Sequence, residues 1–290
     1  MTIPGTLTVV ATPLGNPDDI SPRAAAALRE ADLIVAEDTR SARRLLGSGS
    51  TTTIVSCFDA NEPARAAEVA QRLAEGARVA LVSEAGTPLV SDPGFRVVSA
   101  AIAAGARVVP VPGPSALLAA LVGAGLPTDR FAFLGFPPRK SGQRRKLFES
   151  LRTLPFTLVF YESPLRAAAT LADLAETLGP ERPACLAREL TKPYEEFVRQ
   201  PLGELAARYA EDRPLGEVTL VVGGAGEDAA AEPLSEAEIA EEARDLLAQG
   251  RSARDAADEL SARTGRPRRE IYRLVTRATQ GREGEDDGAE

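Results

Sequence analysis

Short apolar runs alternate with helical segments over the first part of the chain, and this rhythm restricts the fold more than any other feature. Five runs rich in β-branched residues are bounded by turn residues, which predicts buried strands: Leu7–Ala11, Leu33–Ala36, Ile54–Phe58, Val79–Val82 and Val108–Val111. The segments between them have helical composition, and the first opens on Ser21 before Pro22, a capping pair. The alternation predicts a mostly parallel α/β domain over residues 1–118.

The loop after the fourth of these runs, Ser83–Gly94, is both rigid and polar. Glycine or proline sets or frees the backbone at Gly86, Pro88, Pro93 and Gly94. The positions between them carry hydroxyl and carboxyl groups: Ser83, Glu84, Thr87, Ser91 and Asp92. Because open α/β sheets bind ligands beyond the carboxyl ends of their strands, we interpret the loop as a binding site. The alternative is a turn in which Asp92 caps the next helix and Pro93 is its first residue.

Two more loops follow strands at the same edge of the predicted sheet. Pro112–Ala116 is either a strand-to-helix turn with Ser115 as N-cap, or a close backbone approach to a ligand at a helix N-terminus. Glu37–Arg40 is either a solvated ion pair with a helix cap, or the lining of a substrate cleft. We expect the loop Ser83–Gly94 and the loop Pro112–Ala116 to converge.

A second α/β unit is predicted over residues 119–224. Its strands are Phe131–Gly135, Thr157–Tyr161, Cys185–Ala187 and Val218–Val222. A linker at 225–234 precedes a helical domain at 235–280, and an acidic tail at 281–290 has the composition of a disordered segment. The apolar spacing in the helical domain predicts a small helix-turn-helix bundle. Its last helix is rich in arginine and could contact either nucleic acid or protein.

The segment Pro137–Lys146 carries five cations and no acid in a chain of net charge −8, the cations being Arg139, Lys140, Arg144, Arg145 and Lys146. Its prolines and glycine predict a loop. We favour a phosphate-binding arm for RNA over a solvated surface loop, because guanidinium groups suit phosphate oxygens.

Composition excludes several classes of chemistry. The chain has no histidine, so it can build neither a Ser-His-Asp triad nor a histidine metal site, and we expect no metal. No dinucleotide or P-loop glycine motif follows a strand. The two cysteines form no motif, no apolar run reaches the roughly 18 residues of a membrane span, and no signal-like segment opens the chain. These features lead us to expect a cytoplasmic protein without membrane contact.

Six ordered motifs resemble the ribosomal RNA small-subunit methyltransferase I family, a branch of the tetrapyrrole-methylase-like S-adenosylmethionine (SAM) methyltransferases. They are Thr12–Asn16 (T-P-L-G-N), Glu37–Arg40 (E-D-T-R), Ser83–Gly94 (S-E-A-G-T-P-L-V-S-D-P-G), Val111–Ala116 (V-P-G-P-S-A), Phe160–Pro164 (F-Y-E-S-P) and Arg188–Lys192 (R-E-L-T-K). The resemblance covers the chain from about Gly5 to Gly223, and the helical C-terminus resembles a domain that many members carry.

The resemblance implies two α/β domains of tetrapyrrole-methylase type with SAM in the cleft between them, a homodimer, and 2′-O-methylation of cytidine 1402 in 16S rRNA, with S-adenosylhomocysteine as product. The substrate would be 16S rRNA or the small ribosomal subunit. Carried over by motif, the cofactor contacts would be Pro13, Ala85, Gly86, Thr87, Val90, Ser115, Ala116, Tyr161, Glu162 and Leu190.

The ribose hydroxyl is a poor nucleophile until its proton is removed, so a general base is expected near the cleft. The candidates are Lys192, Glu84 and Asp38, with Glu189 beside them. A lysine could serve only if desolvation or nearby cations lowered its pKa toward neutrality.

Two positions depart from the family pattern. Phe58–Glu62 stands where many members have a histidine-bearing H-x-H-N-E segment, and Glu84 stands where aspartate is common. Thr87 replaces an acid that is usual in porphyrin-type members, which favours the rRNA branch. Two other functions compete: a methyltransferase of the same superfamily acting on a porphyrinoid or a protein, and a non-catalytic RNA-binding factor for ribosome assembly.

Overall fold

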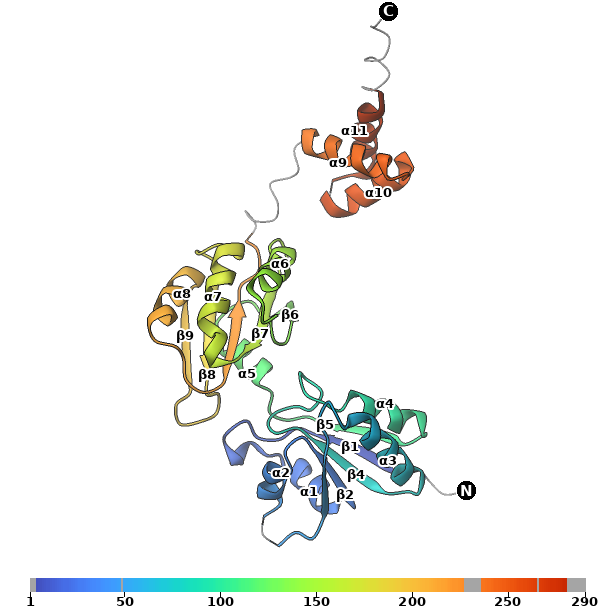
Figure 1. Ribbon diagram of the computed structural model, residues 1–290, viewed down its shortest axis with the longest axis vertical. Coiled ribbons are helices and arrows are strands. Elements are labelled where there is room, and N and C mark those ends of the chain that lie inside the picture. The colour runs from blue at the N-terminus through green and yellow to red at the C-terminus, as the bar shows by residue number, and fades with distance from the viewer. Residues whose placement is uncertain (1–3, 48, 227–235, 265, 281–290) are drawn as a thin grey trace, which may run out of the picture. The chain divides into compact units, whose positions relative to one another are not determined.

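The computed structural model describes residues 4–47, 49–226, 236–264 and 266–280 (Figure 1). Contacts divide the chain into two compact units, one of residues 1–152 and 156–224, the other of residues 153–155 and 225–290. The predicted acidic tail and most of the predicted linker lie outside the described residues. Within the described part of the chain, no helix has the length and apolarity needed to cross a membrane.

The first sheet of unit 1 is parallel throughout, as the alternation of strands and helices predicts. Its strand order is β3-β2-β4-β1-β5. The strands are β1 (Thr6–Val10), β2 (Leu33–Ala36), β3 (Thr53–Ser56), β4 (Arg78–Val82) and β5 (Arg107–Val111). β3 ends two residues earlier than predicted, where the Phe58 amide turns to donate to Asn61 Oδ1 at 2.8 Å.

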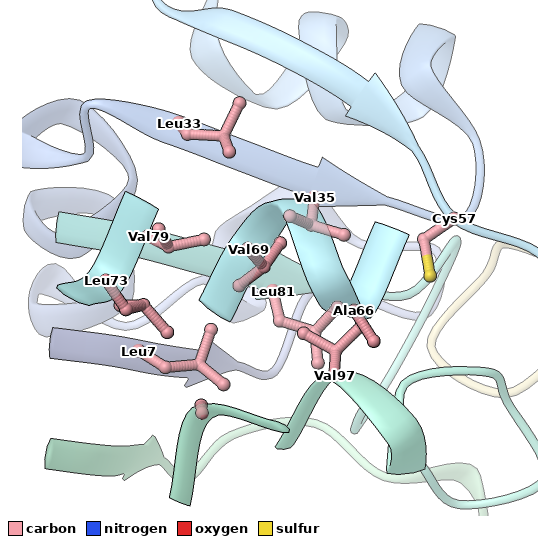
Figure 2. Packing of buried hydrophobic residues seen from close by; sticks show 11 residues of the cluster. Leu7, Leu33, Val35, Cys57, Ala66, Val69, Leu73, Val79, Leu81 and Val97 are labelled. Carbon is pink, nitrogen blue, oxygen red and sulfur yellow. The ribbon is translucent and has the colours of Figure 1, made fainter. Parts of the chain in front are cut away.

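Helices cover both faces of this sheet, which explains why its strands are apolar at consecutive positions. On one face, Ala66, Val69 and Leu73 of α3 (Glu62–Ala74) and Val97 of α4 (Phe95–Ala103) pack over strand residues such as Leu81 (Figure 2). On the other face, α1 (Pro22–Glu30) and α2 (Thr39–Leu46) bury alanine and leucine side chains against the alternate strand positions. The carboxyl ends of the strands, where the motif loops begin, stay outside these two cores.

The second sheet is mixed and has the order β6-β7-β10-β8-β9. β6 (Phe131–Phe133) and β7 (Thr157–Glu162) are parallel, whereas β10 (Val218–Val222) runs antiparallel to β7 and β8 (Pro183–Arg188), and β8 is antiparallel to β9 (Glu196–Pro201). The four predicted strands are present. β9 is an edge strand that the sequence pattern does not predict, because E-F-V-R-Q-P alternates weakly and ends in proline.

Helix α5 (Ala116–Gly123) packs on one face of the second sheet. The boundary expected at residue 118 therefore falls inside a helix. The opposite face is covered by α6 (Ser141–Leu151), α7 (Pro164–Leu178) and α8 (Leu202–Glu211), with Phe148 of α6 edge-to-face on Phe160 at 5.5 Å between ring centres. The expectation that Pro137–Lys146 is all loop is wrong, since Ser141 already begins α6.

The described residues of unit 2 form a bundle of three helices, as predicted: α9 (Glu236–Ala248), α10 (Ala253–Thr264) and α11 (Arg268–Gln280). The core contains the apolar residues whose helical spacing indicated the bundle: Ile239, Ala243, Ala256, Ala257, Leu260, Ile271, Leu274 and Val275. On α11, Arg268 pairs with Asp258, whereas Arg269 and Arg273 are exposed beside the partly exposed ring of Tyr272.

Candidate functional site: a pocket built by the motif loops

A pocket of about 330 Å³ lies where loops of the first sheet meet the end of the second. Its walls come from segments far apart in the sequence: Leu14, Ala85, Gly86, Thr87, Val90, Asp92 and Ala116 from the first part of unit 1, and Phe136, Tyr161, Glu162, Ser163, Pro164, Glu217, Val218 and Thr219 from the second. This volume lies within the range of about 300–1,000 Å³ typical of small-molecule sites.

The loops after β1, β4 and β5 are tied together at the pocket. Thr12 and Gly86 exchange two backbone hydrogen bonds, of 2.8 and 3.0 Å. The Thr87 hydroxyl donates to the Pro114 carbonyl at 2.9 Å. Gly86 has a φ of +81°, and a Cβ there would lie 3.1 Å from Leu14, so glycine suits both the backbone and the close approach. The predicted convergence of the Ala85–Val90 and Pro112–Ala116 loops is confirmed.

The middle of the Ser83–Gly94 loop adopts a backbone that non-glycine residues rarely take. Leu89 has a φ of 72° and Ser91 a φ of 68°. Such conformations are usually found at functional sites, where the surrounding structure over-determines them. Here Gly135 packs so closely on the loop that a Cβ would lie 3.2 Å from Ser91 Oγ.

Asp92 lines the pocket instead of capping α4, so the helix-cap alternative is wrong. The N-cap of α4 is Gly94, and Glu62 supplies the missing acceptor: its Oε1 accepts from the Gly94 amide at 2.9 Å and from the Arg96 amide at 2.8 Å. Burial raises the pKa of the Asp92 carboxyl to about 6, and repulsion from Glu37 adds to the rise while a hydrogen bond with Ser83 opposes it. The pocket thus holds a carboxylate that ionises close to neutral pH.

The wall from the second sheet is aromatic. Tyr161 Oη accepts a hydrogen bond from the Leu117 amide at 3.0 Å, which joins β7 to the first turn of α5. Its ring lies 5.8 Å from the ring of Phe136, whose side chain remains 54% exposed at the pocket mouth. An exposed aromatic ring next to a partly buried one offers a face on which a planar ring can stack.

Glu162 lines the same wall, but its carboxylate is already satisfied. Its oxygens accept from the Ser163 amide at 2.7 Å and the Thr170 hydroxyl at 2.6 Å, and they pair with Arg166 at 2.5 Å. The side chain therefore anchors the start of α7, and a ligand at this position would meet its backbone.

The loops Thr12–Asn16 and Arg188–Lys192 also meet. The Asn16 amide donates to Thr191 Oγ1 at 3.2 Å, and a Cβ on Gly15 would lie only 2.2 Å from Lys192 Cγ. Lys192 Nζ lies 3.0 Å from both Glu189 and Glu217. Burial lowers the pKa of Lys192, but the two carboxylates outweigh burial and raise it above its ordinary value. A lysine that acts as a base needs the opposite, a lowered pKa.

The remaining base candidates differ from each other. Asp38 is the N-cap of α2 and is bound by the Arg40 amide at 2.7 Å and its guanidinium at 3.0 Å, and these bonds lower the pKa of its carboxyl. Glu84 is exposed next to the pocket residue Ala85, and its amide donates to Glu37 Oε2 at 3.3 Å. Among the carboxylate candidates Asp38, Glu84 and Glu189, only Glu84 has no ion pair with a cation among the described residues, because Asp38 pairs with Arg40 and Glu189 with Lys192.

Most of the expected cofactor residues line the pocket, namely Ala85, Gly86, Thr87, Val90, Ala116, Tyr161 and Glu162. Pro13, Ser115 and Leu190 do not line it; Leu190 is buried in the core between α5 and the second sheet. Phe136 and Glu217 were missed, since neither lies in a recognisable motif. Asp92 is one of the polar residues of the predicted binding loop, and it lines the pocket.

The predicted basic arm divides into buried and exposed cations. Arg144 is 4% exposed, and its guanidinium bonds Asp173 at 2.7 and 2.5 Å, which fixes α6 on α7. It is not placed to contact a phosphate. Arg145 pairs with Glu176 at 2.6 Å, while Arg139, Lys140 and Lys146 are exposed and without a carboxylate partner among the described residues.

Comparison with known proteins places this arrangement in a family. Residues 6–206 match the family of Tetrapyrrole (Corrin/Porphyrin) Methylases. The chain is 45% identical over 278 residues to "Ribosomal RNA small subunit methyltransferase I" of Micromonospora olivasterospora, covering 95% of this chain and 88% of the relative. It is 50% identical over 223 residues to the protein of the same name from Pseudomonas aeruginosa, covering 76% and 79%. The chain belongs to the ribosomal RNA small subunit methyltransferase I family.

Solved structures agree on the fold. The methyltransferase CobJ aligns with a TM-score of 0.59 at 26% identity, covering 76% of this chain and 95% of CobJ. A uroporphyrin-III C-methyltransferase from Thermus thermophilus, complexed with S-adenosylhomocysteine, aligns with a TM-score of 0.52 at 24% identity, covering 76% and 97%. The chain has the two-domain α/β fold of the tetrapyrrole methylases and is a SAM-dependent methyltransferase.

The pocket fits SAM by its chemistry. Apolar side chains such as Leu14 and Val90 and the rings of Tyr161 and Phe136 suit the nucleoside, and the Asp92 carboxylate suits a positively charged sulfur. The residues that would hold the cofactor are therefore those of the loop Ala85–Asp92, the start of α5 and the end of β7. Within the described residues no group of three or more potential ligands could hold a metal ion.

Proposed function

We propose that this chain transfers a methyl group from SAM to the ribose 2′-oxygen of cytidine 1402 in 16S rRNA. Two findings support it together. Relatives that are 45–50% identical are named ribosomal RNA small subunit methyltransferase I. Four of the six motif segments that carry the family resemblance line one pocket, and the Thr87–Pro114 hydrogen bond joins two of them.

SAM supplies the electrophilic methyl group when bound, and the chain's own residues must align the hydroxyl and accept its proton. A paired, protonated Lys192 cannot accept a proton, and Asp38 is held by Arg40. Asp92 has a carboxyl pKa of about 6 and lines the pocket, so it is an ionised acceptor at neutral pH with useful basicity. We assign the acceptor role to Asp92 or to Glu84, the exposed carboxylate two residues before Gly86.

RNA would be held by the exposed members of the predicted basic segment, Arg139, Lys140, Arg145 and Lys146, with Arg144 supporting them from within. Arg139 and Lys140 follow closely after the pocket residue Phe136. Cations at this position can bind phosphates flanking a nucleotide whose ribose enters the pocket.

We also propose that the enzyme is a homodimer in the cytoplasm. Helix α5 is apolar on every side, and it leaves Leu118 49% and Val122 74% exposed. Exposed apolar side chains on a helix without a polar face suit a protein interface. Light scattering of the parent and of a Leu118→Glu/Val122→Glu variant tests this assignment, since the variant should have half the parent's mass.

The function is tested by mass spectrometry of 16S rRNA from cells lacking the protein. We expect one 2′-O-methyl group at cytidine 1402 to be missing, and restored by the parent chain. Gly86→Val should fail to restore it, because a larger side chain at a φ of +81° meets Leu14. Gly49→Val is the matched control, since nothing lies within 4 Å of a Cβ there. An unchanged methylation pattern in the deletion strain would refute the proposal.

Calorimetry with SAM separates the enzyme from a non-catalytic assembly factor. The parent should release or absorb heat on titration with SAM, and Gly86→Val should not. A parent chain that binds RNA without binding SAM would favour the assembly factor.

A further inference from the structure

Helix α2 presents three arginines on one face. Arg40, Arg43 and Arg44 are spaced i, i+3 and i+4, so they are neighbours on the helix surface. With Thr39 and Gly47 they line an open hollow of about 420 Å³. All three are exposed, and the Arg40 side chain is 84% exposed. We call these three residues the α2 arginine face.

The positive charge of this face is not balanced by the structure around it. Arg40 pairs with Asp38 at 3.0 Å. Arg44 donates to the Ser41 hydroxyl at 2.8 Å, and neither Arg43 nor Arg44 has a carboxylate within ion-pair distance among the described residues. Like charges three or four residues apart weaken a helix by a few tenths of a kcal/mol per pair. A chain of net charge −8 that leaves two of these three arginines without a carboxylate partner among the described residues has a surface suited to an anion.

The helix dipole accounts for the positions of only two of the three arginines. Arg43 and Arg44 lie in the last turn, where cations are favoured by the helix dipole. Arg40 lies in the first turn, where the dipole opposes a cation, and it is still oriented toward the same hollow. A stabilising role at the helix end would not need all three side chains to line one cavity.

The α2 arginine face begins beside the donor pocket. α2 follows β2, which pairs with β4, and the loop after β4 lines the pocket. The bonds to Asp38 and the nearby charge of Glu84 raise the pKa of Arg40, and Glu84 is the neighbour of the pocket residue Ala85. The α2 arginine face therefore lies at the same sheet edge as the pocket, close to the loop that lines it.

We propose that the α2 arginine face binds the RNA backbone, with Arg43 and Arg44 contacting phosphates next to the nucleotide that is methylated. The inference rests on the proposed function and adds a contact on the first α/β lobe to the basic segment of the second. Guanidinium forks suit phosphate oxygens, and open grooves of this kind follow a single-stranded backbone.

The test is the salt dependence of RNA binding by full-length Arg43→Ala/Arg44→Ala, with unmethylated small ribosomal subunits as the probe. Each lost phosphate contact lowers the slope of log K against log salt by about 0.7 for single strands and about 0.9 for duplexes. Loss of two contacts should lower it by about 1.4–1.8. Between 50 and 200 mM salt, the parent's affinity should therefore fall about 7- to 12-fold further than the variant's.

Two variants keep the test specific. Arg23→Ala/Arg29→Ala removes two exposed arginines from α1 of the same lobe, one of them also in a last turn, and should leave the slope unchanged. Arg43→Lys/Arg44→Lys keeps the charges and should retain the parent slope. SAM affinity and melting temperature should match the parent in all three variants, since alanine and lysine are good helix formers.

An Arg43→Ala/Arg44→Ala slope equal to that of the parent would overturn the inference, as would an equal change in the α1 variant. Either result would leave the proposed function intact if the parent still methylates the subunits. A parent that binds the subunits without methylating them would contradict the proposed function instead.

Discussion

Replacement of Asp92 by asparagine should stabilise the protein at neutral pH and leave its stability unchanged in acid. Burial, assisted by the neighbouring Glu37, raises the pKa of this carboxyl from 3.8 to about 6 in the folded state. Between these two values the folded protein holds a proton that the unfolded chain has lost, so the stability of the parent declines as pH rises through that window. Above pH 6 the Asp92 carboxyl is ionised in both the folded and the unfolded state. The folded state then bears the full cost of a carboxylate that is partly buried and close to Glu37.

The magnitude follows from the shift. About two pKa units at 1.36 kcal/mol each give an upper limit of about 3 kcal/mol, and solvent reaching the partly exposed side chain reduces this to about 1–2 kcal/mol. Asparagine has nearly the same shape and no charge at any pH. For a unit of this size, each kcal/mol raises the melting temperature by about 2–4 °C.

The assay is thermal unfolding of parent and Asp92→Asn followed by circular dichroism from pH 4 to pH 8. The difference in melting temperature should be near zero at pH 4, grow through pH 5–6 and remain constant above pH 7. Asp59→Asn, at an exposed position of the same lobe, supplies a control whose difference should not vary in this way. If the melting temperatures of Asp92→Asn and the parent differ by the same amount at every pH, the Asp92 carboxyl does not titrate near pH 6. The argument for its basicity then fails.

Three further predictions test other contacts. Arg144→Met should destabilise the protein by about 3 kcal/mol in urea unfolding, because the buried Asp173 carboxylate then keeps only the Ser141 hydroxyl and the more distant Arg145 guanidinium, at 3.9 Å, as partners. Arg145→Ala, at a partly exposed side chain, should change stability by less than about 1 kcal/mol. Lys192→Met should leave the midpoint of the pH–rate profile unchanged, since a protonated lysine does not titrate there; a shifted midpoint would restore it as a base. Tyr161→Phe should weaken SAM binding about 5- to 10-fold in calorimetry, since about 1 kcal/mol is lost with the hydrogen bond from the Leu117 amide; unchanged affinity would show that this bond does not shape the pocket.

Strands and helices with strong local patterns could be predicted from the sequence. Leu33–Ala36 and Val218–Val222 are buried on both faces, so their apolar runs have the same bounds in sequence and structure. The edge strand β9 has one buried residue, Val198, and its short, charged sequence gave too weak a pattern. The glycine after Ser141 favours a loop, but burial of Arg144 against Asp173 of α7 and of Phe148 against Phe160 of β7 outweighs that local preference.

The sequence predicts those parts of the pocket whose shape is set by backbone conformation. Glycine and proline impose the shape of the loops around Gly86 and Pro114, so the motifs located the pocket. Side-chain roles depend on tertiary partners that the sequence does not place. Asp92 as a helix cap and Lys192 as a base both agreed with local sequence, yet Glu62 supplies the cap and two carboxylates hold the lysine.

A net charge of −8 disfavours indiscriminate binding of nucleic acid, but the structure separates the two signs of charge in space. The carboxylates of Asp92, Glu37 and Glu84 gather at the donor pocket, where a cationic cofactor gains from them and a phosphate would be repelled. Exposed cations that lack a carboxylate partner among the described residues lie outside it, among them Arg43 and Arg44 of the α2 arginine face and Arg139, Lys140 and Lys146 of the basic segment. A polyanion held by its backbone at these outer positions can bring a neutral ribose to the carboxylates without placing a phosphate among them. The three carboxylates near the pocket therefore suit the cationic methyl donor, whereas the exposed arginines and lysines outside it suit the RNA backbone.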